Sequence, residues 1–468
     1  MSGQHTLLGG VGTDNLFATG LVVSLDGGEG DDSLNVNGQL NQSGSTSYVK
    51  DGSATLQGGS GNDYLGVSQY TRSTLSGGDG NDSLSVYGTG YQSYQTYGTV
   101  PVTSSLQGDA GNDGLNADWL SSVSLVGGEG ADNLNVSNTR SATLDGGVDN
   151  DILNVYVDGF SSYYTDGDSR LSKSYSLDGG EGDDNLNVNG YGHIGYGQVT
   201  VTLKGGVGND TLTVTENYAG DTGNNGQNYG IAKASLEGGD GDDRLQVGGV
   251  LQAILTGGAG VDTFVFTAQQ YRTLLEGTRT FQNSGNSTTS VSADPVMITD
   301  FKVGVGGDVL DYSDLLRNGT LSYDGTNPFG SGFLSVEQAG SDTLLKFDAD
   351  GGSGTTESAV VIARLQNVVA TTLVANNFNP NYSTDGSPAE NLVINGTSLN
   401  EQLIGGFGND TINGLGGNDT IDGQAGSDLI NGGAGDDRLE GNFGNDTIYG
   451  GDGNDTLSDD QGSNLLEG

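Results

Sequence analysis

Aspartate recurs beside clustered glycines in this sequence, a combination that could bind a divalent cation. In GGEGDDSLNV, residues 27–36, the residues Gly27, Gly28 and Gly30 allow the backbone to adopt positive φ and to turn its carbonyls toward one point. Asp32 adds a hard, anionic oxygen, which is the ligand type that Ca²⁺ prefers. One turn supplies only part of a shell of roughly six to eight oxygens. A second turn must therefore stack on the first, with the ion between them.

The same arrangement returns along the N-terminal part of the chain. Aspartate occupies the corresponding position at Asp14, Asp32, Asp63, Asp82, Asp113, Asp132, Asp151, Asp184, Asp210, Asp243 and Asp262. The intervals are 18, 31, 19, 31, 19, 19, 33, 26, 33 and 19 residues. The shortest is about two nonapeptides, the length of one coil with two strands and two turns. The spacing therefore predicts that all these turns lie on one edge of a solenoid.

Strands must position these turns, and the apolar residues mark where the strands run. Leu34 and Val36 are two residues apart and point to one side of a strand, while Ser33 and Asn35 point outward. A return strand is indicated by the leucine before each glycine pair: Leu25, Leu56, Leu75, Leu125, Leu144, Leu177, Leu203, Leu236 and Leu255. The predicted fold is all-β, a parallel β-roll (β-solenoid) stacked along calcium columns. Asn116, Asn135, Asn154 and Asn187 share one outward position, which predicts a ladder of hydrogen-bonded amides.

Five insertions interrupt the first array, which we assign to residues 1–266. They fall around 37–54, 87–104, 156–175, 189–200 and 215–235, between the motif strand and the return strand, and so on the edge opposite the calcium turns. Two of them, 87–98 and 158–169, are dense in Tyr, Ser and Gly. That composition is typical of recognition loops, but it also suits loops that merely cover the side of the solenoid. The second interpretation is favoured, and recognition or self-association remains open.

Residues 267–385 break the repeat. The segment 296–316 is predicted to form a short strand, a glycine turn and a short helix that starts near Asp311. Alternation predicts a hairpin over 332–352 and a further strand over 357–365. We expect this segment to be a compact cap on the first array, whose open end would otherwise expose unpaired edges.

Residues 386–468 restart the motif with a strict period of nine. The aspartates are Asp410, Asp419, Asp428, Asp437, Asp446 and Asp455. A period of nine places calcium turns on both edges, in one column of Asp410, Asp428 and Asp446 and another of Asp419, Asp437 and Asp455. Glu401 and Asn464 lie nine residues outside this series and are its degenerate flanks.

Composition agrees with a polyanion that requires cations. The 468 residues include 86 glycines. The net charge of the chain is −45, which disfavours nucleic acid and anionic membranes as partners. Low hydrophobicity and self-repulsion predict a largely unfolded chain without calcium, so that folding and binding become one event. On the order of 15 ions is expected from the number of gaps between turns. No apolar run is long enough to span a bilayer.

The two ends of the sequence carry their own expectations. Met1 is followed almost at once by a repeat, without a basic region and an apolar region of the kind found in signal peptides. A solenoid entered without an N-terminal cap also suggests a fragment of a longer protein. There are no cysteines.

The glycine and aspartate repeats resemble those of the RTX, or hemolysin-type calcium-binding, family of type I secreted bacterial proteins. The resemblance covers both arrays and, through residues 255–266 and 296–316 and the following hairpin, extends to the C-terminal regions of RTX adhesins, serralysin-type proteases and alginate-epimerase R modules. It implies a parallel β-roll with calcium held by the aspartates and glycine-turn carbonyls. It also implies export from a Gram-negative cell in an unfolded form. Calcium turns on a single edge of the first array, and an ending at SNLLEG inside a degenerate repeat, depart from the family pattern.

Catalytic motifs are missing from the sequence. The two histidines, His5 and His193, form no HExxH motif, and no GxSxG motif or cysteine is present. Trp119 could be a sugar platform, although packing is the favoured interpretation. The leading hypothesis is a noncatalytic extracellular structural or adhesive protein, with cell-surface or polysaccharide ligands or self-association through the Tyr-rich loops. The alternative is the calcium-triggered carrier portion of a larger secreted enzyme or toxin.

Overall fold

The computed structural model describes residues 4–38, 40–43, 46–49, 51–88, 102–158, 172–191, 198–217, 231–282, 288–320, 323, 325–352, 354, 358–459 and 462–468. The chain divides into two compact units. The first comprises residues 1–262 and 276–294, and the second comprises residues 263–275 and 295–468. The predicted boundaries near residues 266 and 385 stay predictions.

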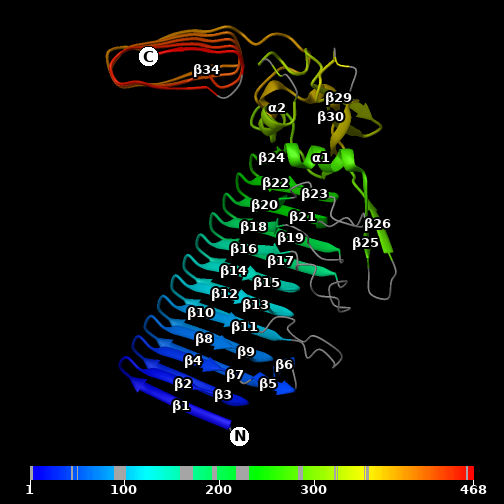
Figure 1. Ribbon diagram of the computed structural model, residues 1–468. Helices are drawn as coiled ribbons and strands as arrows, with labels where there is room; N and C mark the ends of the chain where they lie inside the picture. Colours follow the sequence, from blue (N-terminus) through cyan, green and yellow to red (C-terminus); the bar gives the residue numbers. More distant parts are fainter. Residues whose placement is uncertain are drawn as a thin grey trace. The chain divides into compact units, whose positions relative to one another are not determined.

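Two parallel sheets build the first unit, and successive coils contribute one strand to each (Figure 1). The order in one sheet is β1 (Gln4–Val11), β3 (Val22–Glu29), β7 (Ser53–Ser60), β9 (Arg72–Asp79), β11 (Thr103–Ala110), β13 (Ser122–Glu129), β15 (Ser141–Val148), β17 (Lys173–Glu181), β19 (Val199–Val207), β21 (Ile231–Asp240) and β23 (Gln252–Ala259). The order in the other is β2 (Asn15–Ala18), β4 (Ser33–Asn37), β8 (Tyr64–Ser68), β10 (Ser83–Tyr87), β12 (Gly114–Asp118), β14 (Asn133–Ser137), β16 (Ile152–Asp158), β18 (Asn185–Tyr191), β20 (Thr211–Asn217) and β22 (Arg244–Gly248). The parallel β-roll predicted from the repeat is confirmed.

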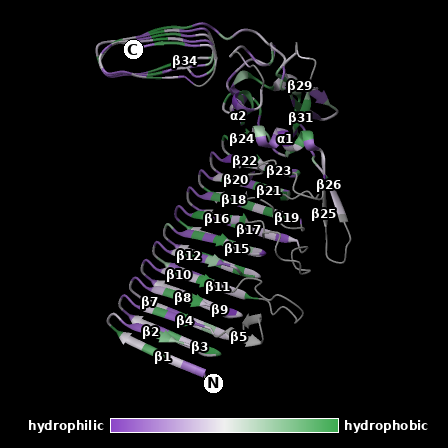
Figure 2. Cartoon of the chain, viewed as in Figure 1, coloured by the Kyte–Doolittle hydropathy of each residue, from purple (hydrophilic) through white to green (hydrophobic). Residues whose placement is uncertain are grey.

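A thin aliphatic core lies between the two sheets. Along β3 and β4 every second residue is buried, as Leu25, Leu34 and Val36 are, and Figure 2 shows polar and apolar residues alternating along the strands. The leucines stack in register from coil to coil, for example Leu25 on Leu56. All nine predicted return-strand leucines are buried. Leu106 belongs to the same column but was missed, because its turn carries Gly108 and Asp109 instead of a glycine pair.

The connections at the edge opposite the aspartate turns hold all five insertions, as the spacing predicts. They run from β4 to β7, β10 to β11, β16 to β17, β18 to β19 and β20 to β21. The first contains a short hairpin of β5 (Leu40–Ser43) and β6 (Thr46–Val49). The Tyr-rich stretches fall almost wholly outside the described residues, as does His193.

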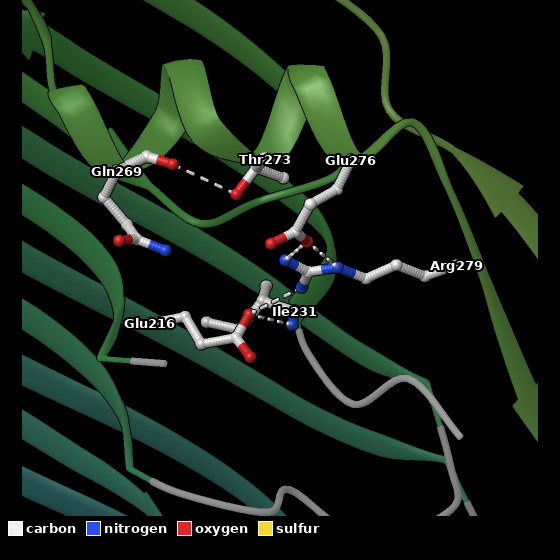
Figure 3. Close-up of polar contacts among 6 residues, drawn as sticks. All are labelled: Glu216, Ile231, Gln269, Thr273, Glu276 and Arg279. Carbon is white, nitrogen blue, oxygen red and sulfur yellow. Dashed lines mark hydrogen bonds and ion pairs between the residues drawn. The ribbon is translucent and has the colours of Figure 1, made fainter. Parts of the chain in front are cut away.

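A second hairpin of the first unit was not predicted. It is formed by β25 (Thr278–Gln282) and β26 (Thr288–Ser292). Val291 joins Ala232 and Leu251 in a small apolar cluster. Arg279 lies buried beside Glu216, at the end of β20 (Figure 3). Apolar contact and a buried ion pair therefore attach this hairpin to the roll.

The non-repeat part of the second unit combines short strands with short helices. They are α1 (Ala268–Glu276), β24 (Thr263–Phe266), β27 (Val296–Ile298), β28 (Val309–Asp311), α2 (Ser313–Asn318), β29 (Leu334–Ala339), β30 (Asp342–Phe347), β31 (Val360–Leu365), two short 3-10 helices, η2 (Ala370–Thr372) and η3 (Ala375–Asn377), and β32 (Phe378–Asn379). The strand, turn and helix over 296–316 are confirmed, as are the hairpin of β29 and β30 and the strand β31. Helix α1 was not predicted.

The second roll has the same construction with shorter coils. One sheet is β33 (Val393–Asn395), β35 (Thr411–Gly416), β37 (Leu429–Ala434), β39 (Thr447–Asp452) and β41 (Leu465–Glu467), and the other is β34 (Gln402–Gly406), β36 (Thr420–Gln424), β38 (Arg438–Glu440) and β40 (Thr456–Ser458). A single isoleucine or leucine per strand fills its core: Ile412, Ile421, Ile430, Leu439 and Ile448. A core this thin leaves much of the stabilisation to the turns.

Candidate metal centre

Each aspartate turn joins a strand that ends in glycines to a strand that begins just after the aspartate. Between β3 and β4, Gly28 has φ of 107° and Gly30 has φ of 119°. Residues that carry a Cβ rarely adopt this backbone conformation. Asp32 follows and is 3% exposed. The sequence folds in this way because glycine makes the bend and the apolar alternation resumes immediately afterwards.

The eleven aspartates of the first roll form one continuous ladder. The backbone N–H of Asp14 donates to Asp32 Oδ1 at 2.7 Å, and that of Asp32 donates to Asp63 Oδ1 at 2.7 Å. The same bond links every successive pair as far as Asp243 and Asp262. The structure thus brings together all eleven predicted residues, on one edge, as expected.

The other carboxylate oxygen of nearly every aspartate is buried and has no hydrogen-bond partner. In the first roll these atoms are Oδ2 of Asp32, Asp63, Asp82, Asp113, Asp132, Asp151, Asp184, Asp210 and Asp243. Asp14 is only half-buried. A buried carboxylate oxygen without a partner is costly. A cation beside it would remove that cost.

The first glycine of each turn leaves space in front of this oxygen. A Cβ built on Gly27 would lie 2.4 Å from Asp32 Oδ2 and 2.6 Å from the carbonyl oxygen of Gly58 in the next coil. The same two kinds of oxygen face Gly127, where Asp132 Oδ2 and the Gly146 carbonyl lie at 2.1 and 2.4 Å. A carboxylate and a backbone carbonyl from adjacent coils therefore converge on a position that a side chain would fill.

The protonation of these carboxyl groups reflects their burial. Burial, reinforced by neighbouring carboxylates, raises the pKa of Asp82, Asp132, Asp151, Asp210 and Asp243 to about 7. It raises the pKa of Asp184 to about 6. Close stacking of carboxylates disfavours the ionised form of each. A divalent cation between coils supplies the opposing charge.

A second ladder runs beside the first in the opposite direction. The residue before the motif aspartate accepts, through its side-chain oxygen, the backbone N–H of the same position in the following coil. Asn62 N–H donates to Asp31 Oδ1 at 2.8 Å, and Asn81 N–H donates to Asn62 Oδ1 at 2.8 Å. The bond recurs at Asn112, Asn150, Asp183, Asn209 and Asp242. Sequence reasoning missed it, although the recurrent Asn or Asp at this position was a usable signal.

The second roll repeats this geometry on both of its edges. Asp410 N–H donates to Asp428 Oδ1 and Asp428 N–H to Asp446 Oδ1, while Asp419, Asp437 and Asp455 form a second series. Oδ2 is buried without a partner in Asp410, Asp419, Asp428, Asp437 and Asp446. Burial raises the pKa of Asp428 to about 8. The two predicted columns therefore exist as side-chain ladders.

Other predicted positions take less part in this arrangement. Glu401 accepts the Thr397 N–H and extends the second column, because its own N–H donates to Asp419 Oδ1. His5 is exposed on β1. Trp119 is half-buried with φ of 59°. Neither interpretation of Trp119 is tested by this placement.

The donor set that results is oxygen-rich and poor in side chains. Nowhere in the described ranges do three or more His, Cys, Asp or Glu side chains gather into a metal cluster. A site at these turns would combine aspartate Oδ2 atoms with backbone carbonyls. Hard oxygen donors of this kind suit Ca²⁺ and not the thiolate- and imidazole-binding metals.

Comparison with known families agrees with this chemistry. The family model described as the RTX calcium-binding nonapeptide repeat (4 copies) matches residues 48–65, 72–87, 395–430, 422–457 and 431–466. The chain carries RTX repeats. Its matched segments lie in both rolls, so the RTX repeats of this chain are calcium-binding repeats of the β-roll type. No curated protein matches the chain.

RTX repeats are typical of secreted proteins. Among the described residues, none of the helices of this RTX chain has the length and apolar character needed to cross a membrane.

Proposed function

We propose that this RTX chain is a noncatalytic, extracellular calcium-binding structural or adhesive protein of a bacterial surface or matrix, which folds on meeting calcium after type I secretion. The side chains proposed to bind calcium are the seventeen motif aspartates of the two rolls. The observation that carries the proposal is the row of buried Oδ2 atoms without a hydrogen-bond partner, which in the first roll runs from Asp32 to Asp243. A chain built for hydrogen bonding alone would satisfy them.

Charge supports the same conclusion. The net charge is −45, and stacked carboxylates would repel one another strongly without cations. About 15 calcium ions would add about +30 and leave about −15. Calcium bound between coils neutralises the ladder and joins each coil to the next. Extracellular calcium modules work at roughly 10⁻⁴ to 10⁻³ M, so the ion would trigger folding outside the cell.

A calcium titration of the full chain tests the proposal. Circular dichroism and small-angle scattering should show an expanded, weakly ordered chain in chelator and a compact β-rich one at millimolar calcium. Magnesium is the control, because it demands a tighter octahedral shell and gives up its water reluctantly. Equal order in chelator and in calcium would rule the proposal out.

Self-association separates the structural role from the alternative, a calcium-triggered carrier portion of a larger secreted enzyme or toxin. Ordered assembly on calcium addition, measured by light scattering, supports a surface or matrix structure. A chain that stays monomeric at millimolar calcium favours the carrier role.

A further inference from the structure

The degenerate repeat over residues 459–467 departs from the motif at two positions of the same turn. Asn464 stands where the column of Asp410, Asp428 and Asp446 calls for another aspartate. Asp459 stands where the first glycine of the turn is expected, eighteen residues after Gly441. One carboxylate is lost and another is gained within six residues.

Asn464 retains the ladder but not its charge. Its Oδ1 accepts the backbone N–H of Asp446 at 2.8 Å, just as Asp446 Oδ1 accepts that of Asp428 at 2.7 Å. An amide oxygen can replace a carboxylate oxygen in this hydrogen bond. It cannot supply the negative charge that the other gaps of the column receive from two successive aspartates.

The side chain of Asp459 lies where that charge is missing. A Cβ built on Gly441 would be 2.4 Å from Asp459 Oδ2 and 2.7 Å from Asp446 Oδ2. In the preceding coil the corresponding position on Gly423 faces Asp428 Oδ2 at 2.5 Å and a backbone oxygen, that of Gly441, at 3.0 Å. The Asp459 carboxylate therefore takes the place that a glycine carbonyl holds elsewhere.

Asp446 directs one buried carboxylate oxygen, Oδ2, toward this position, while its Oδ1 accepts the Asp428 N–H. The residue is 1% exposed, and among the described residues no N–H group donates to its Oδ2, whose neighbour is the Asp459 carboxyl group. The Asp459 Oδ2 atom is buried beside it. Two buried carboxylate oxygens that face one point must either share a proton or bind a cation, and oxygen donors at roughly 2.3 to 2.6 Å suit Ca²⁺.

We propose that Asp459 and Asp446 together hold a calcium ion, so that the carboxylate absent at Asn464 is restored from a different position of the same turn. The inference rests on the proposed function, since it assumes that the column binds calcium. It assigns a ligand that the repeat pattern does not mark, because the motif places glycine at that position.

Asp459→Asn in the full chain tests this assignment, with hydrogen exchange measured over residues 438–468 during a calcium titration. We expect the calcium midpoint of this segment to rise about tenfold, because ligand charge sets calcium affinity. The matched control is Asp452→Asn, which removes the same charge from an exposed side chain of β39. Segments of the first roll should titrate as in the parent chain for both variants. If they do not respond to calcium at all, the proposed function fails and not merely this site.

A rescue variant protects the test against simple misfolding. Asp459→Gly combined with Asn464→Asp restores the repeat consensus and returns the carboxylate to the column, so its midpoint should come back to within about twofold of the parent. Asp459→Gly alone should resemble Asp459→Asn. A midpoint for Asp459→Asn equal to that of Asp452→Asn, or a double variant no better than Asp459→Gly, overturns the assignment.

Discussion

Asp132 Oδ1 accepts the backbone N–H of Asp113 at 2.7 Å, while Asp132 Oδ2 is buried beside Gly127 without a hydrogen-bond partner. The two oxygens of one side chain thus have different tasks. One fixes the register between adjacent coils, and the other faces the position where a cation would sit. Each aspartate of the column therefore links coil stacking to ion binding.

Asp132→Ala should weaken the two sites on either side of its coil. The substitution removes a ligand oxygen and leaves the Asp113 N–H buried without an acceptor, which costs on the order of 1 to 3 kcal/mol. We expect the calcium midpoint, followed by circular dichroism, to rise several-fold. Glu129→Gln is the control, since Glu129 is exposed in the same turn. An unchanged midpoint for Asp132→Ala would count against the stacked sites.

Gly127→Ala should be far more harmful than Gly114→Ala. The new Cβ at position 127 would lie 2.1 Å from Asp132 Oδ2 and 2.4 Å from the Gly146 carbonyl, so it would displace both proposed ligands. At position 114 the nearest atom is the Asp82 carbonyl oxygen at 3.8 Å, and alanine fits without strain. Thermal unfolding in calcium should show a loss for the first variant. The second should be neutral or gain about 0.4 to 1 kcal/mol. Equal melting temperatures would mean that the space before Asp132 has no importance.

Acid should partly replace calcium. The pKa values of Asp82, Asp132, Asp151, Asp210 and Asp243 are raised by burial to about 7 in the folded chain from an ordinary value of 3.8. A raised pKa contributes stability to the calcium-free fold that is complete below about 4 and is lost as pH rises through about 7. In chelator we therefore expect β structure to increase between pH 7.5 and pH 5, as measured by circular dichroism.

The control for this pH prediction is the same titration in saturating calcium. With saturating calcium the signal should change little over the same range, because the ion holds the carboxylates ionised. The calcium midpoint itself should rise as pH falls below about 7, since protons compete for the same oxygens. Order in chelator that decreases on acidification would contradict the assigned pKa shifts.

The repeat made much of this structure predictable. Glycine at positions that require positive φ, followed by aspartate and alternating apolar residues, determines turn and strand together. The amide ladder is a clear example, because Asn135 Nδ2 donates to Asn116 Oδ1 at 3.3 Å and Asn154 Nδ2 to Asn135 Oδ1 at 3.0 Å. Because the strands pair in strict register, asparagines at the same position of successive coils lie side by side, and the sequence spacing alone was enough to predict these hydrogen bonds.

Contacts without a period were not predictable in this way. Glu216 and Arg279 are 63 residues apart and belong to no repeat, so only the folded chain brings them together. Asp459 was overlooked for a related reason, because a search for the motif discards residues that break it. The periodic residues are those that resemble the RTX repeat, whereas the features particular to this chain, such as Asp459, are at positions that depart from the repeat.

Arg279→Met should detach the hairpin of β25 and β26 from the roll. Arg279 Nη1 lies 3.2 Å from Glu216 Oε2 and Nη2 lies 2.7 Å from Glu276 Oε2, and both Arg279 and Glu216 are buried (Figure 3). Burial raises the pKa of Glu216 to about 7, and Arg279 opposes that rise. Without the guanidinium, Glu216 should carry a proton at neutral pH. Removing one partner of a buried pair costs about 3 to 5 kcal/mol.

Hydrogen exchange over residues 278–294 and denaturant unfolding in calcium measure this loss. Arg72→Met is the matched control, because Arg72 pairs with Asp51 at 2.9 Å but both side chains are 62% exposed. Exposed pairs contribute little, so this variant should unfold almost as the parent does. Replacing both partners, as in Glu216→Leu with Arg279→Met, should recover most of the loss, since no unpaired charge is then buried. Equal effects of Arg279→Met and Arg72→Met would show that the buried pair does not anchor the hairpin.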